Sequence, residues 1–152
     1  FFKRVKTYVI KRYQTDQRGI EADKIMPKKK FQRAIAQVRN YLNAVENQDL
    51  VLAKSFLGNN FKFIFPGNNV FLTLEGVIDW AKPRYHWIKK NYDHFDPLMT
   101  DDNIVIVYCH GTLYGEWLDR STFSKIRFID RFTLKGDKLL DQMVWNDLAE
   151  YK

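Results

Sequence analysis

The hydrophobic positions of residues 29–46 recur every three or four residues and form one apolar stripe. This spacing is typical of an amphipathic helix with one face against a core. The residues ENQD end it, and LVLAKSFLGNN predicts a second, short helix closed by Gly58. A third helix is predicted from Leu74 to about Asn91, broken or kinked just before Pro83. The stripe of the first helix consists of Phe31, Ala34, Ile35, Val38, Tyr41, Leu42 and Val45.

The second half of the chain alternates between apolar and polar residues, which is typical of β-strands. Four such segments follow one another: YDHFDPLM, NIVIVYCHGTLYGEW, TFSKIRFIDRFTL and KLLDQMVW. KGDK predicts a tight turn between the last two, and an earlier short strand, FKFIFPGNN, is stopped by Pro66 and Gly67. Helices first and antiparallel strands last predict an α+β fold, in which helices cover one face of a curved sheet and leave a cavity between them.

Charge divides the chain into two parts. Residues 1–30 hold ten Lys and Arg against three Asp and Glu, so they carry the whole net charge of +7. We predict a basic amphipathic N-terminal helical arm with a polar connector over residues 1–28, where Pro27 starts the next helix, and one domain over residues 29–152. The arm could pack on its own domain or on a second copy, contact an acidic membrane surface, or bind nucleic acid. The neutral body does not predict sequence-specific nucleic-acid binding.

Several kinds of chemistry lack their sequence signatures. The chain has no Gly-rich phosphate loop, no HExxH and no GxSxG motif. His86, His94 and His110 share no metal-ligand spacing, and Cys109 is the one cysteine, so we expect neither a metal nor a cofactor. No apolar run approaches the roughly 18 residues that read as a membrane span. We therefore expect a cytoplasmic protein, with peripheral membrane contact through the arm as the alternative.

Polar side chains on apolar faces are the candidate site. Asp130 in IRFIDRFTL shares a strand face with four large hydrophobic residues, and an ionised Asp there needs a partner. Each such group could be a satisfied core residue, but several polar tips in one apolar cavity are typical of a small-molecule site. The other polar candidates are Tyr41 on the helix stripe, His110 in phase with Ile106 and Tyr108, and Asp147 in phase with Met143 and Trp145. The predicted apolar lining is Phe63, Phe65, Trp80, Phe128, Phe132 and Trp145.

Three segments of the chain resemble the SnoaL-like and ketosteroid-isomerase-like branch of the nuclear-transport-factor-2-like superfamily. They are RNYLNAVENQDLVLAKSF, HGTLYGEW and IRFIDRFTLKGDKLLDQMVWNDL. The resemblance covers about residues 31–151. It implies a cone-shaped α+β barrel of three helices on a strongly curved, mostly antiparallel sheet, here preceded by an extra N-terminal helix. The superfamily hosts isomerases, cyclases, dehydratases, hydrolases and non-catalytic modules, so the fold does not define an activity.

The resemblance assigns roles to particular residues. Ketosteroid isomerases hold an enolate oxygen between a tyrosine and a protonated aspartic acid, and Tyr41 in NYLNAVENQD and Asp130 in FIDRF match those two positions. The family's carboxylate base precedes a proline, where FIFPGN has Phe65, so the base of that route is missing. SnoaL-like cyclases use strand-borne His and Asp groups, which makes His110 the candidate acid or base and Asp147 a weaker one.

Two functions remain open at this point. One is an isomerase, cyclase or hydro-lyase in which Tyr41 and Asp130 donate to a developing oxyanion on a hydrophobic carbonyl-containing or ring-containing ligand. The other is a non-catalytic binding or assembly module in which Asp130 only accepts hydrogen bonds, recruited to a partner or membrane by the arm. The resemblance also predicts a homodimer through the sheet, with Lys125, Arg127 and Arg131 facing outward and acidic partners such as Glu116 or Asp141 on the other copy.

Overall fold

The protein is described here by a computed structural model that covers residues 17–101 and 103–151, with side chains placed in 27–100 and 103–151. Its helices are α2 (Gln17–Glu46), α3 (Leu50–Ser55) and α4 (Leu74–Ala81), with a short 3-10 helix, Leu148–Tyr151, at the end. The strands are β1 (Leu57–Phe65), β2 (Asn69–Phe71), β3 (Trp87–Asp101), β4 (Ile104–Glu116), β5 (Thr122–Lys135) and β6 (Lys138–Asn146). Most of the predicted basic arm lies outside the described residues.

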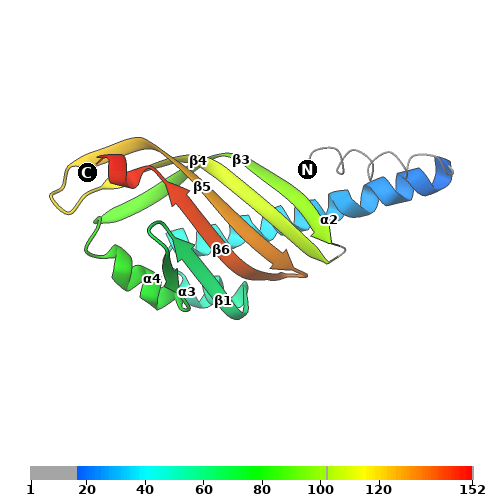
Figure 1. Cartoon of the computed structure of the whole chain (residues 1–152), viewed down its shortest axis with the longest axis horizontal. Helices are drawn as coiled ribbons and strands as arrows, with labels where there is room; N and C mark the ends of the chain where they lie inside the picture. Colours follow the sequence, from blue (N-terminus) through cyan, green and yellow to red (C-terminus); the bar gives the residue numbers. More distant parts are fainter. Residues whose placement is uncertain (1–16, 102, 152) are drawn as a thin grey trace.

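The six strands form one curled sheet in the order β2-β1-β6-β5-β4-β3. Neighbouring strands are antiparallel except β1 and β6, which are parallel. Strands β2 and β3 are the two edges, so the sheet curls without closing. Helix α2 crosses one face of it, while α3 and α4 lie together near β1 (Figure 1). The α+β fold with three helices on a curved, mostly antiparallel sheet is therefore confirmed.

Helix α2 supplies the helical side of the core. The predicted stripe packs on the sheet, with Ala34, Val38 and Tyr41 buried. The helix already includes Gln17 and runs through Pro27, so the predicted polar connector was wrong over residues 17–27. Proline removes one backbone hydrogen bond, but the flanking residues IEADKIM and KKKF are mostly good helix formers, so the helix continues past it. The N-terminal part of α2 extends beyond the end of the sheet (Figure 1).

Two predicted helix ends were wrong. Helix α3 is capped by Asp49 and ends at Ser55, while Gly58 lies inside β1. A Cβ on Gly58 would lie 3.1 Å from the carbonyl oxygen of Leu139, so this glycine allows the close approach of β1 to β6. Helix α4 ends at Ala81 and does not resume after Pro83. Residues 87–101 form β3 instead, and their backbone groups are hydrogen-bonded to β4 and not within a helix.

Candidate functional site

A pocket of about 670 Å³ lies between the inner face of the sheet, the C-terminal part of α2 and helix α4. Its wall is largely apolar, and Phe63, Phe65 and Trp80, three of the predicted lining residues, belong to it. Phe128 and Phe132 are instead packed into the core at 4% and 0% exposure, outside that wall. The other apolar lining residues include Leu42, Val45, Leu74, Val77, Tyr85, Ile88, Tyr92, Leu113, Trp117 and Val144.

On one side of the pocket Phe65 and Trp80 belong to the wall, and Phe71 packs against both of them. The Trp80 ring lies 5.2 Å from Phe65 and 5.6 Å from Phe71, measured between centroids. The Arg84 guanidinium stacks on Trp80, with Cζ 3.9 Å from the ring centroid, and its Nη1 donates to the Trp80 carbonyl at 3.4 Å. A cation over a tryptophan face is attracted by the electron-rich ring. This side of the pocket is therefore apolar and ends in a positive charge.

A chain of polar side chains forms the inner side. The Tyr41 hydroxyl donates to Oε1 of Gln142 at 3.3 Å, and Nε2 of Gln142 donates to Oδ2 of Asp130 at 3.2 Å. The Lys90 ammonium pairs with the same carboxylate oxygen and lies 4.5 Å from the Phe128 ring centroid. Tyr41, Gln142 and Lys90 line the pocket, whereas the fully buried Asp130 lies behind them.

These contacts give Asp130 the role of a hydrogen-bond acceptor. Both side-chain neighbours of its Oδ2, Lys90 and Gln142, are donors, and one of them is a cation. Its Oδ1 has no hydrogen-bond partner within the described structure. The sequence-based assignment of a neutral Asp130 that donates beside Tyr41 therefore does not fit this geometry. Tyr41 also points its hydroxyl proton at Gln142 and not at open pocket.

Burial and this charge raise the pKa values of the nearby acids. Burial, and then the Asp130 carboxylate, raise the pKa of the Tyr41 hydroxyl. Burial followed by the Cys109 and Asp130 charges does the same for the pKa of Tyr92. For the Cys109 thiol, burial is again the main cause and Asp130 the second, and the pKa rises to about 12. The tyrosines and the thiol around the pocket are therefore neutral at physiological pH.

Lys90 reaches Asp130 across strand β4. On β3, Ile88, Lys90 and Tyr92 alternate toward the pocket, and β4 lies between β3 and β5 in the sheet. Gly111 of β4 pairs with Tyr92 on one side and Phe128 on the other, and it places no side chain on the inner face. A Cβ there would lie 1.9 Å from the Asn91 carbonyl oxygen, so β3 and β4 approach closely at this glycine.

His110 is not part of the pocket. It alternates with the buried Cys109 and Gly111, so its ring projects from the opposite, outer face of the sheet. There it lies 5.6 Å from the His94 ring and 3.7 Å from the Asp96 carboxylate. The prediction assigned His110 to the wrong face because residues 104–107 are all apolar, so the alternation does not show which face is buried.

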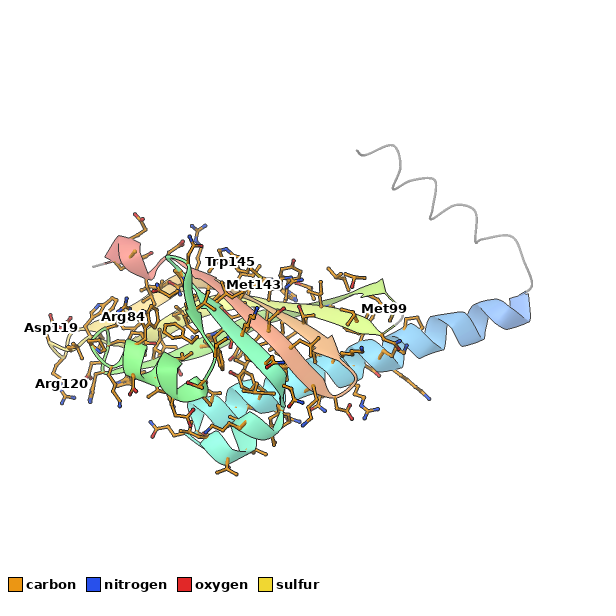
Figure 2. The ribbon with its side chains drawn as sticks, turned by 60° about the horizontal axis from the view of Figure 1, so that its bottom comes forward. Arg84, Met99, Asp119, Arg120, Met143 and Trp145 are labelled. Atoms are coloured by element: carbon orange, nitrogen blue, oxygen red, sulfur yellow. The ribbon has the colours of Figure 1, made fainter. Side chains whose placement is uncertain are left out.

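A β-bulge in β6 moved two further candidates. Thr133 pairs with Asp141 and Leu134 with Leu139, so one extra residue interrupts the register. In a regular strand, Leu139 and Gln142 would face opposite sides, but the bulge lets both face inward. Trp145 therefore projects from the outer face, where it is 46% exposed. Figure 2 shows Met143 and Trp145 on the side of β6 away from the helices.

Asp147 is also outside the pocket. Its Oδ2 accepts a hydrogen bond from Nε of Arg127 at 2.6 Å, and its backbone N–H donates to the Arg127 carbonyl at 3.1 Å. The Arg127 side chain is 84% exposed, so this pair stands on the surface. Arg131 likewise pairs with Asp141 of the same chain, at 3.5 Å. The acidic partners of both arginines are therefore intramolecular, and the predicted pairs with a second copy are not needed.

Sequence reasoning missed most of the polar pocket residues, among them Glu46, Arg84, Lys90 and Gln142. Lys90 was hidden because residues 87–91 were assigned to a helix, although in strand phase it alternates with two apolar residues. Gln142 was hidden by the bulge. Glu46 ends a recognised apolar stripe, so its position beside the pocket could have been inferred. Arg84 follows a proline in a connecting segment, where no periodicity predicts its direction.

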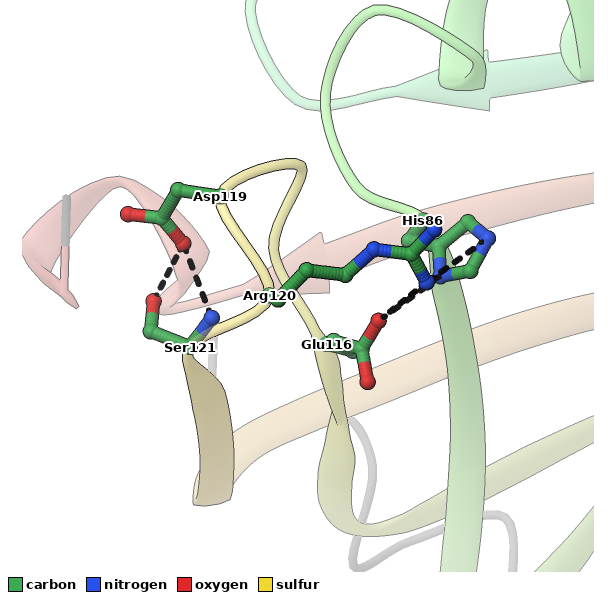
Figure 3. Close-up of polar contacts among 5 residues, drawn as sticks. All are labelled: His86, Glu116, Asp119, Arg120 and Ser121. Atoms are coloured by element: carbon green, nitrogen blue, oxygen red, sulfur yellow. Dashed lines mark hydrogen bonds and ion pairs between the residues drawn. The ribbon is translucent and has the colours of Figure 1, made fainter.

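A polar cluster fastens the loop between β4 and β5 to the segment before β3 (Figure 3). The Glu116 carboxylate lies 2.7 Å from Nδ1 of His86 and accepts from Arg120 at 3.0 Å, which holds the pKa of Glu116 below its usual value. The His86 backbone N–H also donates to the Glu116 carbonyl at 2.8 Å. Within the loop, Ser121 donates twice to Asp119. These contacts fix the position of the segment between α4 and β3, which contains the pocket residue Arg84.

Among the residues that the structure describes, no group of three or more His, Cys, Asp or Glu side chains could hold a metal ion. No helix in this part of the chain is long and apolar enough to cross a membrane.

No family model matches the chain, and no curated protein matches it by sequence. Solved structures match it closely in shape. A hexachlorocyclohexane dehydrochlorinase, LinA-type3 from Novosphingobium barchaimii, is 12% identical with a TM-score of 0.66, over 84% of this chain and 90% of that one. A SnoaL-like polyketide cyclase from Jannaschia is 13% identical with a TM-score of 0.60, over 79% and 89%.

A third structure names the fold itself. It is an NTF2-like protein with a cystatin-like fold from Novosphingobium aromaticivorans, 8% identical with a TM-score of 0.62, covering 86% of this chain and 90% of that one. At such low identities the likeness shows the fold alone. The chain has the nuclear-transport-factor-2-like, cystatin-like fold, and the resemblance predicted from the sequence is confirmed at that level.

Proposed function

We propose that the protein binds a small hydrophobic molecule with a carbonyl or hydroxyl oxygen, and that Lys90 donates a hydrogen bond to that oxygen. The observation that carries the proposal is the combination of a largely apolar pocket of about 670 Å³ with Lys90, Gln142 and Tyr41 together on one part of its wall. Apolar cavities with a few converging polar groups are typical of small-molecule sites.

Lys90 takes the donor role that the family resemblance gave to Tyr41 and Asp130. An ammonium has three N–H donors, and Asp130 occupies one of them. The remaining N–H donors of the ammonium can stabilise negative charge that develops on a ligand oxygen. Tyr41 and Gln142 act through Asp130, because their hydrogen bonds fix its position.

Proton transfer beside the carbonyl is the catalytic form of this proposal. Glu46 is the acidic side chain in the described pocket wall. Its carboxylate would take a proton from the carbon next to the carbonyl, the electron pair would move onto the oxygen, and Lys90 would stabilise the enolate. If a double bond is conjugated with the enolate, return of the proton from Glu46 to the far carbon isomerises the ligand. If the ligand has a second carbonyl, attack of the enolate carbon on it closes a ring, and the new alkoxide takes the proton back from Glu46. The enzyme names of two structural neighbours are compatible with catalysis in this fold.

Matched ligands test the binding step. 2-Acetonaphthone and 2-ethylnaphthalene have similar apolar bodies, but one has a carbonyl oxygen. We expect the ketone to bind about 10-fold more tightly, as a hydrogen bond to a charged donor predicts. The preference should vanish in Lys90→Gln/Asp130→Asn, which removes both charges without leaving one unpaired. Equal binding of the two ligands would exclude the role of Lys90, and no binding of either would exclude the pocket.

Hydrogen exchange tests the catalytic step. In deuterated water, the acetyl group of 2-acetonaphthone should gain deuterium faster with the protein than without it, as followed by mass spectrometry. Glu46→Gln should abolish the acceleration while leaving the affinity for the ketone within a few fold. Binding without accelerated exchange would favour the non-catalytic alternative.

The alternative is a ligand-binding or assembly module without turnover, recruited to a surface by its basic N-terminal segment. The internal satisfaction of Tyr41 and of Asp130 Oδ2 favours it. The charge of the first 30 residues suggests an acidic surface as the target. Flotation with vesicles containing phosphatidylserine, compared with neutral vesicles and with a chain lacking residues 1–16, tests this. Equal recovery with both vesicles would exclude membrane recruitment.

We also propose that two copies pair through the outer face of the sheet. Ile129 and Trp145 are register partners on neighbouring strands and are 37% and 46% exposed. Side-by-side apolar side chains at that exposure are typical of an interface. Sedimentation at micromolar concentration should give a dimer, and Trp145→Glu should give a folded monomer. A monomeric wild-type chain would contradict the proposal.

A further inference from the structure

The positive charges of the pocket wall are not equally compensated. Lys90 is paired with Asp130, and the Lys89 ammonium lies 3.8 Å from the Glu46 carboxylate. Arg84 forms no salt bridge with any side chain that the structure describes. Counted together with the Asp130 carboxylate behind it, the pocket wall therefore has one excess positive charge, which belongs to Arg84.

Arg84 is held in place without using its hydrogen-bonding capacity. It is half-buried, its guanidinium stacks on Trp80, and the hydrogen bond recorded for it is a long one to the Trp80 carbonyl. A guanidinium has five N–H donors in a fixed plane, and stacking fixes that plane while leaving its edge free. Burial raises the pKa of the nearby Tyr85 hydroxyl, and the Arg84 charge acts against that rise.

Together these features define an anion subsite at one end of an apolar pocket. A flat, preorganised guanidinium edge matches the two oxygens of a carboxylate, which can accept two parallel hydrogen bonds. One uncompensated positive charge also matches the single negative charge of a carboxylate. The aromatic cluster of Phe65, Phe71 and Trp80 lies directly next to it, where the apolar body of such a ligand would begin.

We infer that the ligand of this pocket is an aromatic or fused-ring carboxylic acid whose carboxylate binds Arg84 while its ring system fills the apolar pocket. The inference rests on the proposed ligand-binding function and adds the substrate class. In this arrangement Lys90 and Arg84 contact different parts of the ligand, because Lys90 lies within β3 and Arg84 lies in the segment between α4 and β3. Arg84 fixes the orientation of the ligand, and Lys90 contacts its other oxygen function.

The test compares 2-naphthoate with 2-naphthamide by isothermal titration calorimetry at pH 7.5. The two have the same shape, but only the acid is charged. We expect the carboxylate to bind about 10-fold more tightly, at the low end of the range for charge-assisted hydrogen bonds because Arg84 is only half-buried. In Arg84→Gln the ratio of the two affinities should fall to about one, chiefly through weaker binding of the carboxylate.

Lys82→Gln is the matched control. It removes the same charge two residues away, from an exposed side chain paired with Asp79 outside the pocket wall. It should keep the preference for the carboxylate, because a direct contact and not the general positive field produces it. Loss of the preference in Lys82→Gln to the same extent as in Arg84→Gln would overturn the inference.

The remaining outcomes separate this inference from the proposed function. Equal affinities of the wild-type protein for 2-naphthoate and 2-naphthamide would overturn the carboxylate subsite and leave the pocket proposal intact. Equal weakening of both ligands in Arg84→Gln would likewise show that Arg84 only supports Trp80. Binding of neither compound at millimolar concentration would overturn the pocket proposal and the inference with it. The wild-type comparison does not depend on the variant being folded.

Discussion

The Lys90 ammonium on β3 is paired with the Asp130 carboxylate on β5, across the intervening strand β4. The Lys90 side chain is 21% exposed and Asp130 is fully buried, so the pair has one end at the pocket and one end in the core. In such a pair, loss of either partner leaves a poorly solvated charge. The interaction between Lys90 and Asp130 should therefore contribute measurably to the free energy of unfolding.

A double-mutant cycle at this pair should show strong coupling. Asp130→Asn and Lys90→Met should each lower the free energy of unfolding by about 3 kcal/mol, because each leaves the other charge without its partner. The double variant should lose at least about 2 kcal/mol less than the sum of the two. Urea unfolding followed by tryptophan fluorescence measures all four proteins, and additive losses would mean that the pair is screened by solvent.

Gly111 should not tolerate a side chain. Its Cβ would approach the Asn91 carbonyl oxygen to 1.9 Å, and backbone atoms cannot move aside as a flexible side chain can. We expect Gly111→Ala to lower the free energy of unfolding by about 2 to 3 kcal/mol, as overpacking does elsewhere. Thr112→Ala, one residue along the strand with its side chain on the other face, is the control. A Gly111→Ala protein as stable as the control would show that β3 shifts at little cost.

The sequence predicted those parts of the fold that depend on periodicity. The apolar stripe from Phe31 to Val45 and the alternation around Asp130 are both confirmed, because each covers several turns or residue pairs of one regular element. The helix predicted after Pro83 was wrong. Residues 87–91 are too few to distinguish a helical from a strand periodicity, and in the structure they form a strand because they pair with β4.

The candidate site was harder to predict because its faces depend on register. The extra residue in β6 reverses the directions of Gln142 and Trp145, and no turn or proline in the sequence indicates it. Lys90 acquires its role from a residue two strands away, which a single sequence does not place beside it. Asp130 was identified as a candidate because its neighbours in the chain already predict that it is buried. Its partner, Lys90, was not identified.

Tyr41→Phe and Gln142→Leu should differ in their effects. Tyr41→Phe removes one hydrogen bond to Gln142 and should lower the free energy of unfolding by about 1 kcal/mol. Gln142→Leu leaves the Tyr41 hydroxyl without its acceptor and Asp130 without one of two donors, so its loss should be at least twice as large. Chemical denaturation orders the two variants. The reverse order would show that Gln142 does not connect Tyr41 to Asp130.

The stability of the protein should fall at alkaline pH, and Cys109 should account for the first part of the fall. Burial raises the pKa of its thiol from 9.0 to about 12, so the folded chain keeps a proton that the unfolded chain releases. The contribution is fully present below about pH 9 and is lost as the pH rises toward 12. From these values, the loss between neutral pH and pH 10 is on the order of 1 kcal/mol.

Cys109→Ala isolates this contribution. The variant is less stable at every pH because it loses buried volume, but its stability should be flatter between pH 8 and pH 10 than that of the wild type. Above pH 10 both proteins should lose stability, because Tyr41 and Tyr92 also keep their protons in the folded state by burial. Urea unfolding at pH 7.5, 9 and 10 gives the comparison. Parallel pH profiles over this range would show that the thiol ionises as readily in the folded chain as in the unfolded one.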